Sequence, residues 1–271
     1  MSDYSFTPIG VIHSCFKEKF GIPRQPGVAS EARATLELYP PFACQEALVE
    51  LEGFSHVWII FVFHQALRKV ADEKGHGPAW RPTVRPPRLG GNQRIGVFAS
   101  RSPFRPNPIG MSAVTLAGIE NIDGCFYLQL RGADLLEGTP VLDIKPYLPY
   151  ADALPRARAG YASEAPAEVA EVRFSKAVTS QVAEYEREKY PGLQRLIEQV
   201  LGQDPRPAYY AQRDNSAQRE TQPESESGRQ FGMRLYDFDL QWRVDAGCIE
   251  VTALRPLATA AAGLDAFDGG G

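Results

Sequence analysis

Short runs of β-favouring residues alternate with turns along the first 150 residues of the chain. The runs are rich in Val, Ile, Thr and aromatic residues, and Gly, Pro, Asn or Asp bounds them. Asp123-Gly124 separates two runs and is typical of a two-residue hairpin turn with positive φ at both positions. Because no amphipathic helix intervenes, we expect a closed or nearly closed barrel rather than a doubly wound α/β sheet. The seven expected strands are residues 6–12, 32–39, 57–63, 95–100, 113–122, 125–131 and 140–147.

Two of these runs differ in how apolar residues are distributed between their faces. Residues 57–63 are apolar at every position, which predicts a central strand covered on both faces. His64 and Gln65 follow at its end, where ligand-binding groups are often placed, although a lone histidine is also commonly structural. In residues 140–147 the charged side chains stand at odd positions, whereas the even positions are apolar. We expect one core face and one polar face, with Asp143 and the other odd positions, Val141 included, on the same side.

The second half of the chain predicts a smaller α+β domain. Apolar residues recur at helical spacing over residues 174–185 and 193–201, and Pro191 interrupts the pattern between them. Residues 233–244 and 248–254 have the character of two strands joined by a turn. We therefore expect two helices followed by a hairpin.

Linkers and tails set the expected domain boundaries. Residues 151–172 are rich in Ala, Pro and Glu without periodicity and predict a connector. The polar segment 212–228 and the Ala/Gly-rich end of the chain lack the apolar residues of a packed core, so we expect both to be disordered. The expected division is a barrel domain at 1–150, a connector at 151–172, an α+β domain at 173–257 and a disordered tail at 258–271.

Composition is that of a soluble globular protein. Hydrophobic residues make up 44% and charged residues 23%, which excludes collagen-like, coiled-coil and wholly disordered chains. The longest apolar run is far shorter than the roughly twenty residues of a membrane-spanning helix. The first residues also lack the features of a secretory signal, so we expect a cytoplasmic protein without a membrane partner. Four widely spaced cysteines and four scattered histidines predict mostly buried, reduced thiols and no bound metal.

The net charge of −4 conceals a basic stretch, residues 81–110, which we call the arginine segment. It contains six Arg, six Pro and no Asp or Glu. Proline fixes φ and stiffens the backbone, and guanidinium groups suit planar contacts with phosphate, carboxylate or bases. We therefore expect a rigid anion-binding surface. The alternative is a solvated loop that offsets an otherwise acidic surface.

Several ordered blocks of the chain resemble the TrmO family, also called TsaA or YaeB-like. Two further blocks resemble the C-terminal domain of its bacterial members, whereas segment 212–228 and the tail are longer than in that pattern. The barrel blocks are residues 6–27 (FTPIGVIHSCFKEKFGIPRQPG), 51–65 (LEGFSHVWIIFVFHQ), 80–112 (WRPTVRPPRLGGNQRIGVFASRSPFRPNPIGMS) and 134–150 (DLLEGTPVLDIKPYLPY). The C-terminal blocks are residues 204–209 (DPRPAY) and 236–242 (YDFDLQW).

The resemblance implies a homodimeric, S-adenosylmethionine-dependent tRNA methyltransferase built on a β-barrel. Its family substrate is the adenosine 3′ of the anticodon, position 37, which already carries an N6-threonylcarbamoyl group and is methylated at that N6. The chain has no Gly-x-Gly-x-x-Gly turn and no Walker lysine loop. A non-Rossmann scaffold for the cofactor accounts for their absence.

The resemblance and the residue pattern together assign residues to the site. Asn107 is the candidate substrate-facing group, because its side-chain carbonyl could accept the N6–H, and Asp143 is an alternative acceptor. Asn107 could instead serve only a turn between two prolines, and Asp143 only an ion pair with Lys145 or an arginine. The expected cofactor site contains Pro23, Arg24, Gln25, His64, Gln65, Arg94, Arg101, Asp134, Leu135, Leu136 and Glu137. The expected contacts with the anticodon loop of tRNA are Arg81, Arg85, Arg88, Arg105 and Lys145.

Two other functions are compatible with the same residues. A non-catalytic RNA-binding module would use the arginine segment without methyl transfer, and it would not bind S-adenosylmethionine. A methyltransferase with a different acceptor would bind the cofactor but modify another tRNA base or a small molecule.

Overall fold

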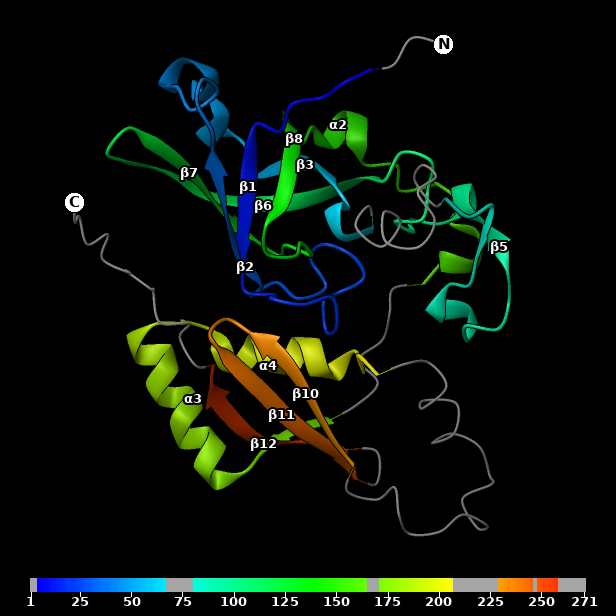
Figure 1. Ribbon diagram of the computed structural model, residues 1–271, viewed down its shortest axis with the longest axis vertical. Coiled ribbons are helices and arrows are strands. Elements are labelled where there is room, and N and C mark those ends of the chain that lie inside the picture. Colours follow the sequence, from blue (N-terminus) through cyan, green and yellow to red (C-terminus); the bar gives the residue numbers. More distant parts are fainter. Residues whose placement is uncertain (1–3, 67–79, 165–170, 207–228, 246–247, 258–271) are drawn as a thin grey trace, which may run out of the picture.

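Six strands of the N-terminal half close into a barrel in which every neighbouring pair is antiparallel (Figure 1). Their order is β1-β2-β7-β6-β3-β8, and the pairing of β1 with β8 closes the barrel. The expected mainly β barrel is confirmed. The strands are β1 (Gly10–Ser14), β2 (Arg33–Leu38), β3 (His56–Val62), β6 (Ile109–Ile122), β7 (Cys125–Arg131) and β8 (Thr139–Pro146). This computed structural model describes residues 4–66, 80–164, 171–206, 229–245 and 248–257.

The inward-facing side chains of these strands form the barrel core. Buried and half-buried positions alternate along β2, as they do in a sheet that turns one face inward. Burial of a large aliphatic side chain contributes about 1.5–3 kcal/mol relative to leaving it exposed. The core includes Ile12, Leu36, Val57, Ile59, Leu128, Leu130 and Val141, each at most 1% exposed.

The turn between β6 and β7 has the predicted geometry. Asp123 has a φ of 51° and Gly124 a φ of 85°, and Ile122 pairs with Cys125 across the turn. Glycine adopts positive φ without the steric penalty of a Cβ atom. The local sequence therefore specifies this hairpin.

Residues 95–100 do not form a barrel strand, so that prediction was wrong. Only β5 (Ile95–Gly96) is extended, and it pairs with β4 (Thr83–Val84) in a separate two-stranded sheet. A 3₁₀ helix, Val97–Ala99, follows at once. The barrel consequently has six strands rather than seven. The other short helices of this half are 3₁₀ helices Gln45–Leu48, Leu51–Gly53, Pro87–Leu89 and Gly160–Ala162, and α2 (Pro149–Asp152).

Strand β3 is fully covered on one face only, in contrast to the prediction. Val57, Ile59 and Phe61 point into the barrel and are at most 5% exposed. The alternate positions of β3 are only half-buried. They continue onto the paired positions of β6, because directly opposite residues of antiparallel strands share a face. We call this surface the outer apolar face: Trp58, Ile60, Val62, Ile109 and Met111.

A β-bulge in β8 changes the faces expected for that strand. Ile60 pairs with Asp143, but the next residue, Phe61, pairs with Val141, so Leu142 is an additional residue. One additional residue reverses the parity of a strand. Val141 therefore points into the core, whereas Asp143 lies on the outer side with Ile60. The expected grouping of Val141 with Asp143 was wrong.

A four-stranded sheet and two helices form the C-terminal domain (Figure 1). The strand order is β10-β11-β12-β9, in which β9 is parallel to β12 and the other pairs are antiparallel. Ser175 caps α3 by accepting the Val178 N–H. The expected α+β character is confirmed. The elements are β9 (Glu171–Phe174), α3 (Lys176–Glu188), α4 (Leu193–Gly202), β10 (Gln230–Leu235), β11 (Phe238–Asp245) and β12 (Cys248–Pro256).

Two details of this domain differ from the sequence pattern. Phe174 ends a strand rather than beginning a helix, and a turn at Tyr236, with a φ of 51°, divides residues 233–244 between β10 and β11. The expected hairpin between β11 and β12 is confirmed. The division of the chain at residues 150 and 173 stays a prediction. Segment 212–228 and the tail 258–271 lie wholly outside the described residues.

The segment between β1 and β2, residues 15–32, joins the two domains. Its Cys15, Phe16 and Ala29 belong to one buried cluster with the helices and sheet of the C-terminal domain. Phe16 also forms a β-bridge with Leu235 of β10. One hydrophobic core therefore spans the junction, and we call residues 15–32 the junction segment.

Candidate functional site

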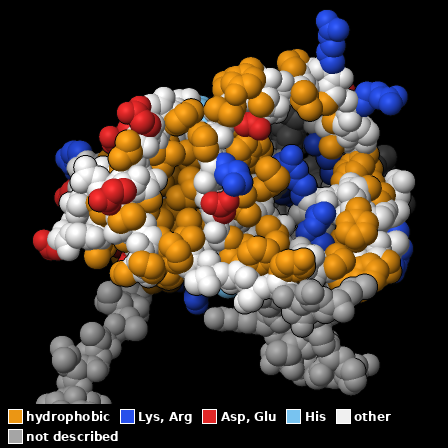
Figure 2. Space-filling view, turned by 90° about the horizontal axis from the view of Figure 1, so that it is seen from above, with side chains coloured by type: hydrophobic (Ala, Val, Ile, Leu, Met, Phe, Trp, Pro, Cys, Tyr) orange, Lys and Arg blue, Asp and Glu red, His pale blue; other side chains and the backbone are white. Residues whose placement is uncertain are grey.

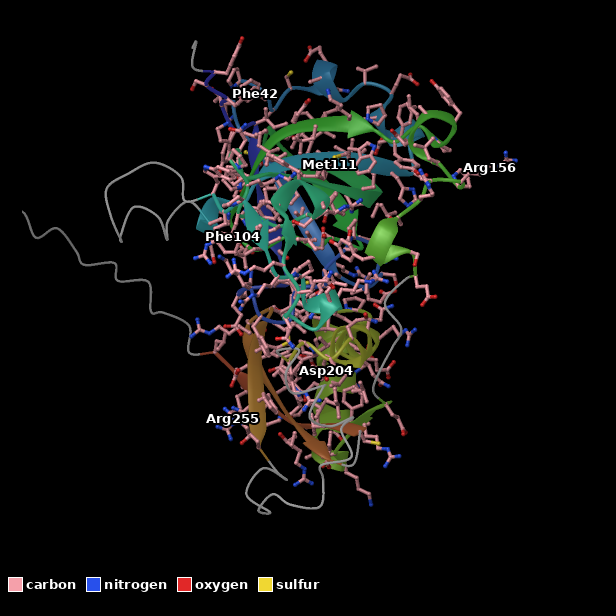
Figure 3. All side chains as sticks on the ribbon, turned by 90° about the vertical axis from the view of Figure 1, so that its right-hand side faces the viewer. Phe42, Phe104, Met111, Arg156, Asp204 and Arg255 are labelled. Atoms are coloured by element: carbon pink, nitrogen blue, oxygen red, sulfur yellow. The ribbon has the colours of Figure 1, made fainter. Side chains whose placement is uncertain are left out.

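The arginine segment folds back on itself beside the barrel. Arg81 lies over the Phe104 ring at 5.3 Å, and its backbone N–H donates to the Phe104 carbonyl at 3.0 Å. Arg94 donates to the Thr83 hydroxyl at 3.2 Å. Figure 2 shows Lys and Arg side chains gathered around a hollow on the side where Figure 1 places β5. Phe104 is labelled on the barrel domain in Figure 3. The segment thus presents cationic groups next to the barrel.

Arg101 of this segment lies near three side chains from other parts of the barrel domain. Arg101 donates to the Gln25 side-chain oxygen at 2.5 Å. Ser112 of β6 donates to an oxygen of Asp134 at 2.6 Å, and the charge of Arg101 acts on Asp134, opposing the rise in its pKa that burial causes. We call these four residues the central site. It unites the expected cofactor residues Gln25, Arg101 and Asp134.

Burial is the largest influence on the ionisation of Asp134 in the central site. It raises the pKa of Asp134 above its ordinary value, while the Ser112 hydrogen bond and the Arg101 charge act in the opposite direction. Ser112 itself is 1% exposed. Sequence reasoning missed Ser112, because one serine within an apolar strand is ordinarily uninformative. Its inward position, opposite Ile59, is what brings it to Asp134.

The remaining residues of the 134–137 loop are buried apolar residues or belong to a different polar network. Leu135 is 1% exposed and belongs to the barrel core, and Leu136 is 7% exposed. Glu137 enters a separate polar network. Of these four side chains, Asp134 alone joins the central site in the contacts made among the described residues.

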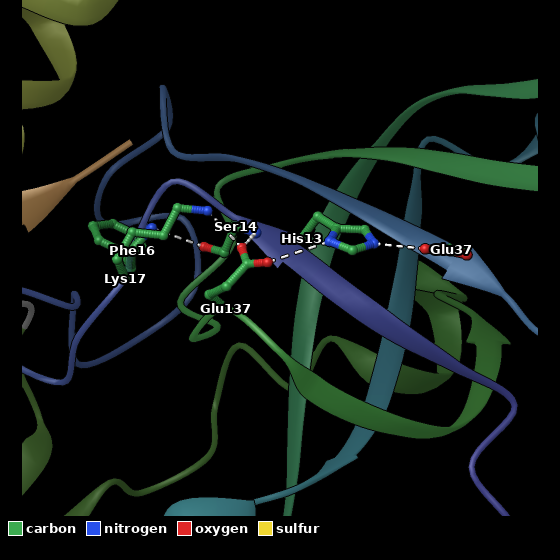
Figure 4. A network of polar contacts seen from close by, with 6 residues as sticks. All are labelled: His13, Ser14, Phe16, Lys17, Glu37 and Glu137. Carbon is green, nitrogen blue, oxygen red and sulfur yellow. Dashed lines mark hydrogen bonds and ion pairs between the residues drawn. The ribbon is translucent and has the colours of Figure 1, made fainter. Parts of the chain in front are cut away.

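Glu137 lies at the centre of that polar network, which Figure 4 shows. It accepts hydrogen bonds from the Lys17 ammonium at 2.7 Å and from the Ser14 N–H at 2.6 Å. His13 lies between two carboxylates, with Nε2 2.7 Å from Glu37 and Nδ1 3.2 Å from Glu137. These contacts tie the end of β1 to the loop that carries Asp134.

The same network shifts two pKa values. The hydrogen bond to Glu37 raises the pKa of His13; burial opposes this effect, and Glu137 reinforces it. Burial favours the neutral form of Glu137, but the hydrogen bonds from Lys17 and Ser14 outweigh it and lower the pKa of Glu137. The two pKa shifts favour the protonated, charged form of His13 and the ionised form of Glu137.

Asn107 lies at the end of the β3–β6 strand pair. The Phe63 N–H donates to the Pro108 carbonyl at 2.8 Å, which places Asn107 beside the residues that follow β3, namely His64 and Gln65. The Asn107 side chain is exposed and has no hydrogen-bond partner among the described residues. Its backbone carbonyl accepts from the Ile109 N–H at 2.7 Å, so it also forms a turn. The geometry is compatible with both roles considered for Asn107.

Asp143 lies on the opposite side of the barrel wall from Ser112. Ile59, which points inward, pairs with Ser112, whereas Ile60, which points outward, pairs with Asp143. Asp143 is 2.8 Å from the Lys145 ammonium, and both side chains are exposed. Within one copy of the chain, the structure does not bring Asp143 to the central site.

The other candidates lie at or near the surface. Pro23 is buried beside the exposed Arg24. Desolvation lowers the pKa of Arg24, and Asp204 of the C-terminal domain opposes this shift. Arg81, Arg85 and Arg88 are exposed, and Arg105 donates to the Ser100 carbonyl at 2.9 Å.

The described part of the chain holds no group of three or more His, Cys, Asp or Glu that could bind a metal ion. No helix there is both long and apolar enough to span a membrane. The four cysteines are free thiols. Only Cys15 is buried, which raises its pKa to about 12, and Cys125 is exposed, so the expectation of mostly buried thiols was wrong.

Comparison with known proteins gives matches over both domains. The model of the tRNA-methyltransferase O N-terminal domain matches residues 11–153, and that of the TrmO C-terminal domain matches residues 167–257. A crystal structure of TrmO from Pseudomonas aeruginosa superposes with a TM-score of 0.71 at 42% identity, covering 93% of this chain and 98% of the other.

Curated relatives match over nearly the whole chain. The tRNA (adenine(37)-N6)-methyltransferase of Escherichia coli K12 is 48% identical over 256 residues, which are 94% of this chain and 100% of the relative. A putative S-adenosylmethionine-dependent methyltransferase, RcsF, of Pseudomonas aeruginosa PAO1 is 50% identical over 239 residues, 88% of this chain and 92% of the relative. The chain therefore belongs to the tRNA-methyltransferase O family.

Proposed function

We propose that this chain is an S-adenosylmethionine-dependent tRNA methyltransferase that methylates N6 of adenosine 37, next to the anticodon. The acceptor adenosine carries an N6-threonylcarbamoyl group. Relatives named for adenine(37)-N6 methylation and for dependence on S-adenosylmethionine match most of the chain and support the reaction. The observation that carries the proposal is the central site, where the Arg101 guanidinium of the arginine segment acts on the desolvated carboxyl of Asp134.

The residues of the central site fit the polar groups of S-adenosylmethionine. Arg101 suits a carboxylate, whereas Asp134 and the Gln25 carbonyl suit an ammonium group or ribose hydroxyls. The Ser112 hydrogen bond fixes one oxygen of Asp134. Pro23, Arg24, His64, Gln65, Arg94, Leu135, Leu136 and Glu137 complete the cofactor site in this proposal.

The reaction needs alignment more than a strong base. S-adenosylmethionine supplies a methyl group that its sulfonium already activates. The protein must hold the N6 nitrogen in line with that methyl at near-attack distance. Asn107 orients the nitrogen by accepting its N–H through the side-chain carbonyl, and the proton then passes to water. Asp143 is the alternative acceptor, but its ion pair with Lys145 on the outer side favours Asn107.

The arginine segment supplies the contacts with RNA. Its exposed guanidinium groups pair with phosphates, and its exposed aromatic rings offer stacking surfaces for unstacked loop bases. Arg81, Arg85, Arg88, Arg105 and Lys145 contact the RNA backbone in this proposal. The exposed rings of the segment are Phe98 and Phe104, at 75% and 38% exposure, and Trp80, at 49%, directly precedes it.

Two copies of the chain associate through the outer apolar face. Met111 is 55% and Ile109 39% exposed, and they adjoin the half-buried Trp58 and Ile60. Contiguous exposed apolar surface of this kind is typical of protein interfaces. The homodimer acts on cytoplasmic tRNA.

Mass spectrometry of tRNA nucleosides tests the reaction. A strain that lacks this chain should contain threonylcarbamoyladenosine without its N6-methyl derivative, and the intact chain should restore the methyl group. Unchanged methylation in that strain would disprove the proposed acceptor. Loss of a methyl group from a different nucleoside would favour the alternative of another substrate.

Calorimetry separates catalysis from simple RNA binding. We expect S-adenosylmethionine to bind the chain, alone or in the presence of tRNA. Binding of tRNA without binding of the cofactor under either condition would favour a non-catalytic RNA-binding module.

A further inference from the structure

The C-terminal domain holds the start of the junction segment by backbone contacts. The Tyr236 N–H donates to the Cys15 carbonyl at 2.7 Å, next to the β-bridge between Phe16 and Leu235. The Arg234 N–H donates to the Glu18 carboxylate at 3.0 Å. Strand β10 thus fixes the chain as it leaves β1.

Aromatic packing holds the middle of the junction segment. Phe20 stacks on Trp242 with ring centroids 5.9 Å apart and an interplanar angle of 7°. Trp242 is fully buried in the C-terminal domain. Gly21 adopts a φ of +85° and lies so close to Met233 that a Cβ would be 2.3 Å from its methyl carbon. Phe20 and Gly21 come just before Arg24 and Gln25.

Gln199 of α4 holds the end of the junction segment. Its side-chain oxygen accepts the Glu31 N–H at 3.1 Å, and its side-chain nitrogen donates to the Ser30 hydroxyl at 2.8 Å. Gln199 is 7% exposed, between the buried Leu196 and Val200. A buried amide among aliphatic neighbours needs partners of this kind. The junction segment supplies both of them.

The opposite side of the junction segment contacts the central site. Gln25 accepts from Arg101 at 2.5 Å. The Gly27 N–H donates to the Gly132 carbonyl at 2.8 Å, two residues before Asp134. A Cβ at Gly132 would lie 3.3 Å from the Gly27 Cα, so the two backbones are in close contact. Movement of the junction segment would therefore displace both charged groups of the central site.

We propose that Gln199 is a positioning residue for methyl transfer. From the C-terminal domain it anchors the junction segment, which holds Gln25 against Arg101 and Gly27 against Gly132. The affinity of the central site for S-adenosylmethionine therefore depends on a domain that contributes none of the four central-site side chains. This inference rests on the proposed function, because it takes the central site to bind the cofactor.

Steady-state kinetics of the full-length protein test this role. Loss of the two Gln199 hydrogen bonds in Gln199→Ala should raise the KM for S-adenosylmethionine about tenfold while kcat changes less than about twofold. Gln194→Ala is the matched control, because Gln194 is an exposed glutamine on the same helix. It should leave both constants unchanged. A wild-type KM in Gln199→Ala, or a fall in kcat at unchanged KM, would overturn the proposal.

A double-mutant cycle tests the route of the effect. If Gln199 acts through Gln25, Gln199→Ala should raise the KM less in a Gln25→Ala background than in the wild type. Full additivity would contradict that route. Should Gln199→Ala fail to fold, Ser30→Ala removes one of the same hydrogen bonds from the exposed side and should raise the KM about threefold. A wild-type KM in Ser30→Ala would then refute the proposal.

Arg101→Ala distinguishes this inference from the proposed function. An increased KM for the cofactor in Arg101→Ala together with a wild-type KM in Gln199→Ala overturns the role of Gln199 alone. A wild-type KM in Arg101→Ala shows that the central site does not bind the cofactor, and the proposed site and this inference then fail together.

Discussion

Individual residues of the central site act through the protonation state of Asp134. Burial raises the pKa of Asp134 and so disfavours ionisation, whereas the Ser112 hydrogen bond and the Arg101 charge favour ionisation. An acceptor for an ammonium or a ribose hydroxyl is strongest as the anion. In the proposed function the Ser112 hydroxyl therefore helps to keep Asp134 ionised, although Ser112 is only 1% exposed.

Substitution Ser112→Ala should move the acid limb of the pH profile to higher pH. The Ser112 hydrogen bond counteracts the rise in the Asp134 pKa that burial causes. Without that hydrogen bond the pKa of Asp134 rises further, and the anion forms only at higher pH. The measurement is kcat/KM for S-adenosylmethionine against pH. An unchanged profile, or one displaced towards acid, would contradict this role of Asp134.

His13 should stabilise the fold in a pH-dependent manner. Its pKa is raised above 6.5, so its stabilising charge is fully present below that value and is lost as the pH rises through the raised pKa. Because the lowered pKa of Glu137 keeps its carboxylate charged across this range, His13→Gln should lower the melting temperature more at about pH 6 than at about pH 9. An equal decrease in melting temperature at both pH values would mean that the ion pairs of His13 with Glu37 and Glu137 do not stabilise the fold.

Local sequence specified some elements of this fold and not others. The Asp123-Gly124 turn was predictable because the requirement for positive φ acts on those two residues alone. The bulge at Leu142 was not, because it depends on the register between β8 and β3. Residues 95–100 were misassigned for a similar reason, since their β-favouring composition does not reveal that β4 is their only strand partner among the described residues.

The candidate site shows the same limit. Resemblance to a family supplied Gln25, Arg101 and Asp134, which the structure then brings together. Ser112 and Gln199 were not predicted, because their proposed roles depend on contacts with residues distant in sequence. Gln199, for example, is 168 residues from Glu31 and 169 residues from Ser30. The role of a buried polar residue can be inferred only when its hydrogen-bond partner is known.

The arginine segment should account for the salt dependence of tRNA binding. Arg85 and Arg88 are exposed within it. Each phosphate contact that is lost reduces the slope of log affinity against log salt by about one. Arg85→Ala and Arg88→Ala should each do so, whereas Arg255→Ala, on the C-terminal domain in Figure 3, should not. Identical slopes in all three variants would remove the segment from RNA binding.

At the scale of the whole molecule, the proposed dimer depends on the outer apolar face. Met111→Lys places a charge at its most exposed residue and should convert the dimer to a monomer. Ile122→Lys is the matched control, because Ile122 is 54% exposed at the tip of the β6–β7 hairpin. Sedimentation velocity measures both variants. A dimeric Met111→Lys protein, or a monomeric wild type, would place the interface elsewhere or exclude the dimer.

The two domains share one buried cluster, and in our proposal the C-terminal domain supports the cofactor site on the barrel. A crystal structure with S-adenosylmethionine tests the location of that site most directly. We predict the cofactor within hydrogen-bonding distance of both Arg101 and Asp134, beside the arginine segment. Cofactor bound away from both residues would contradict the account.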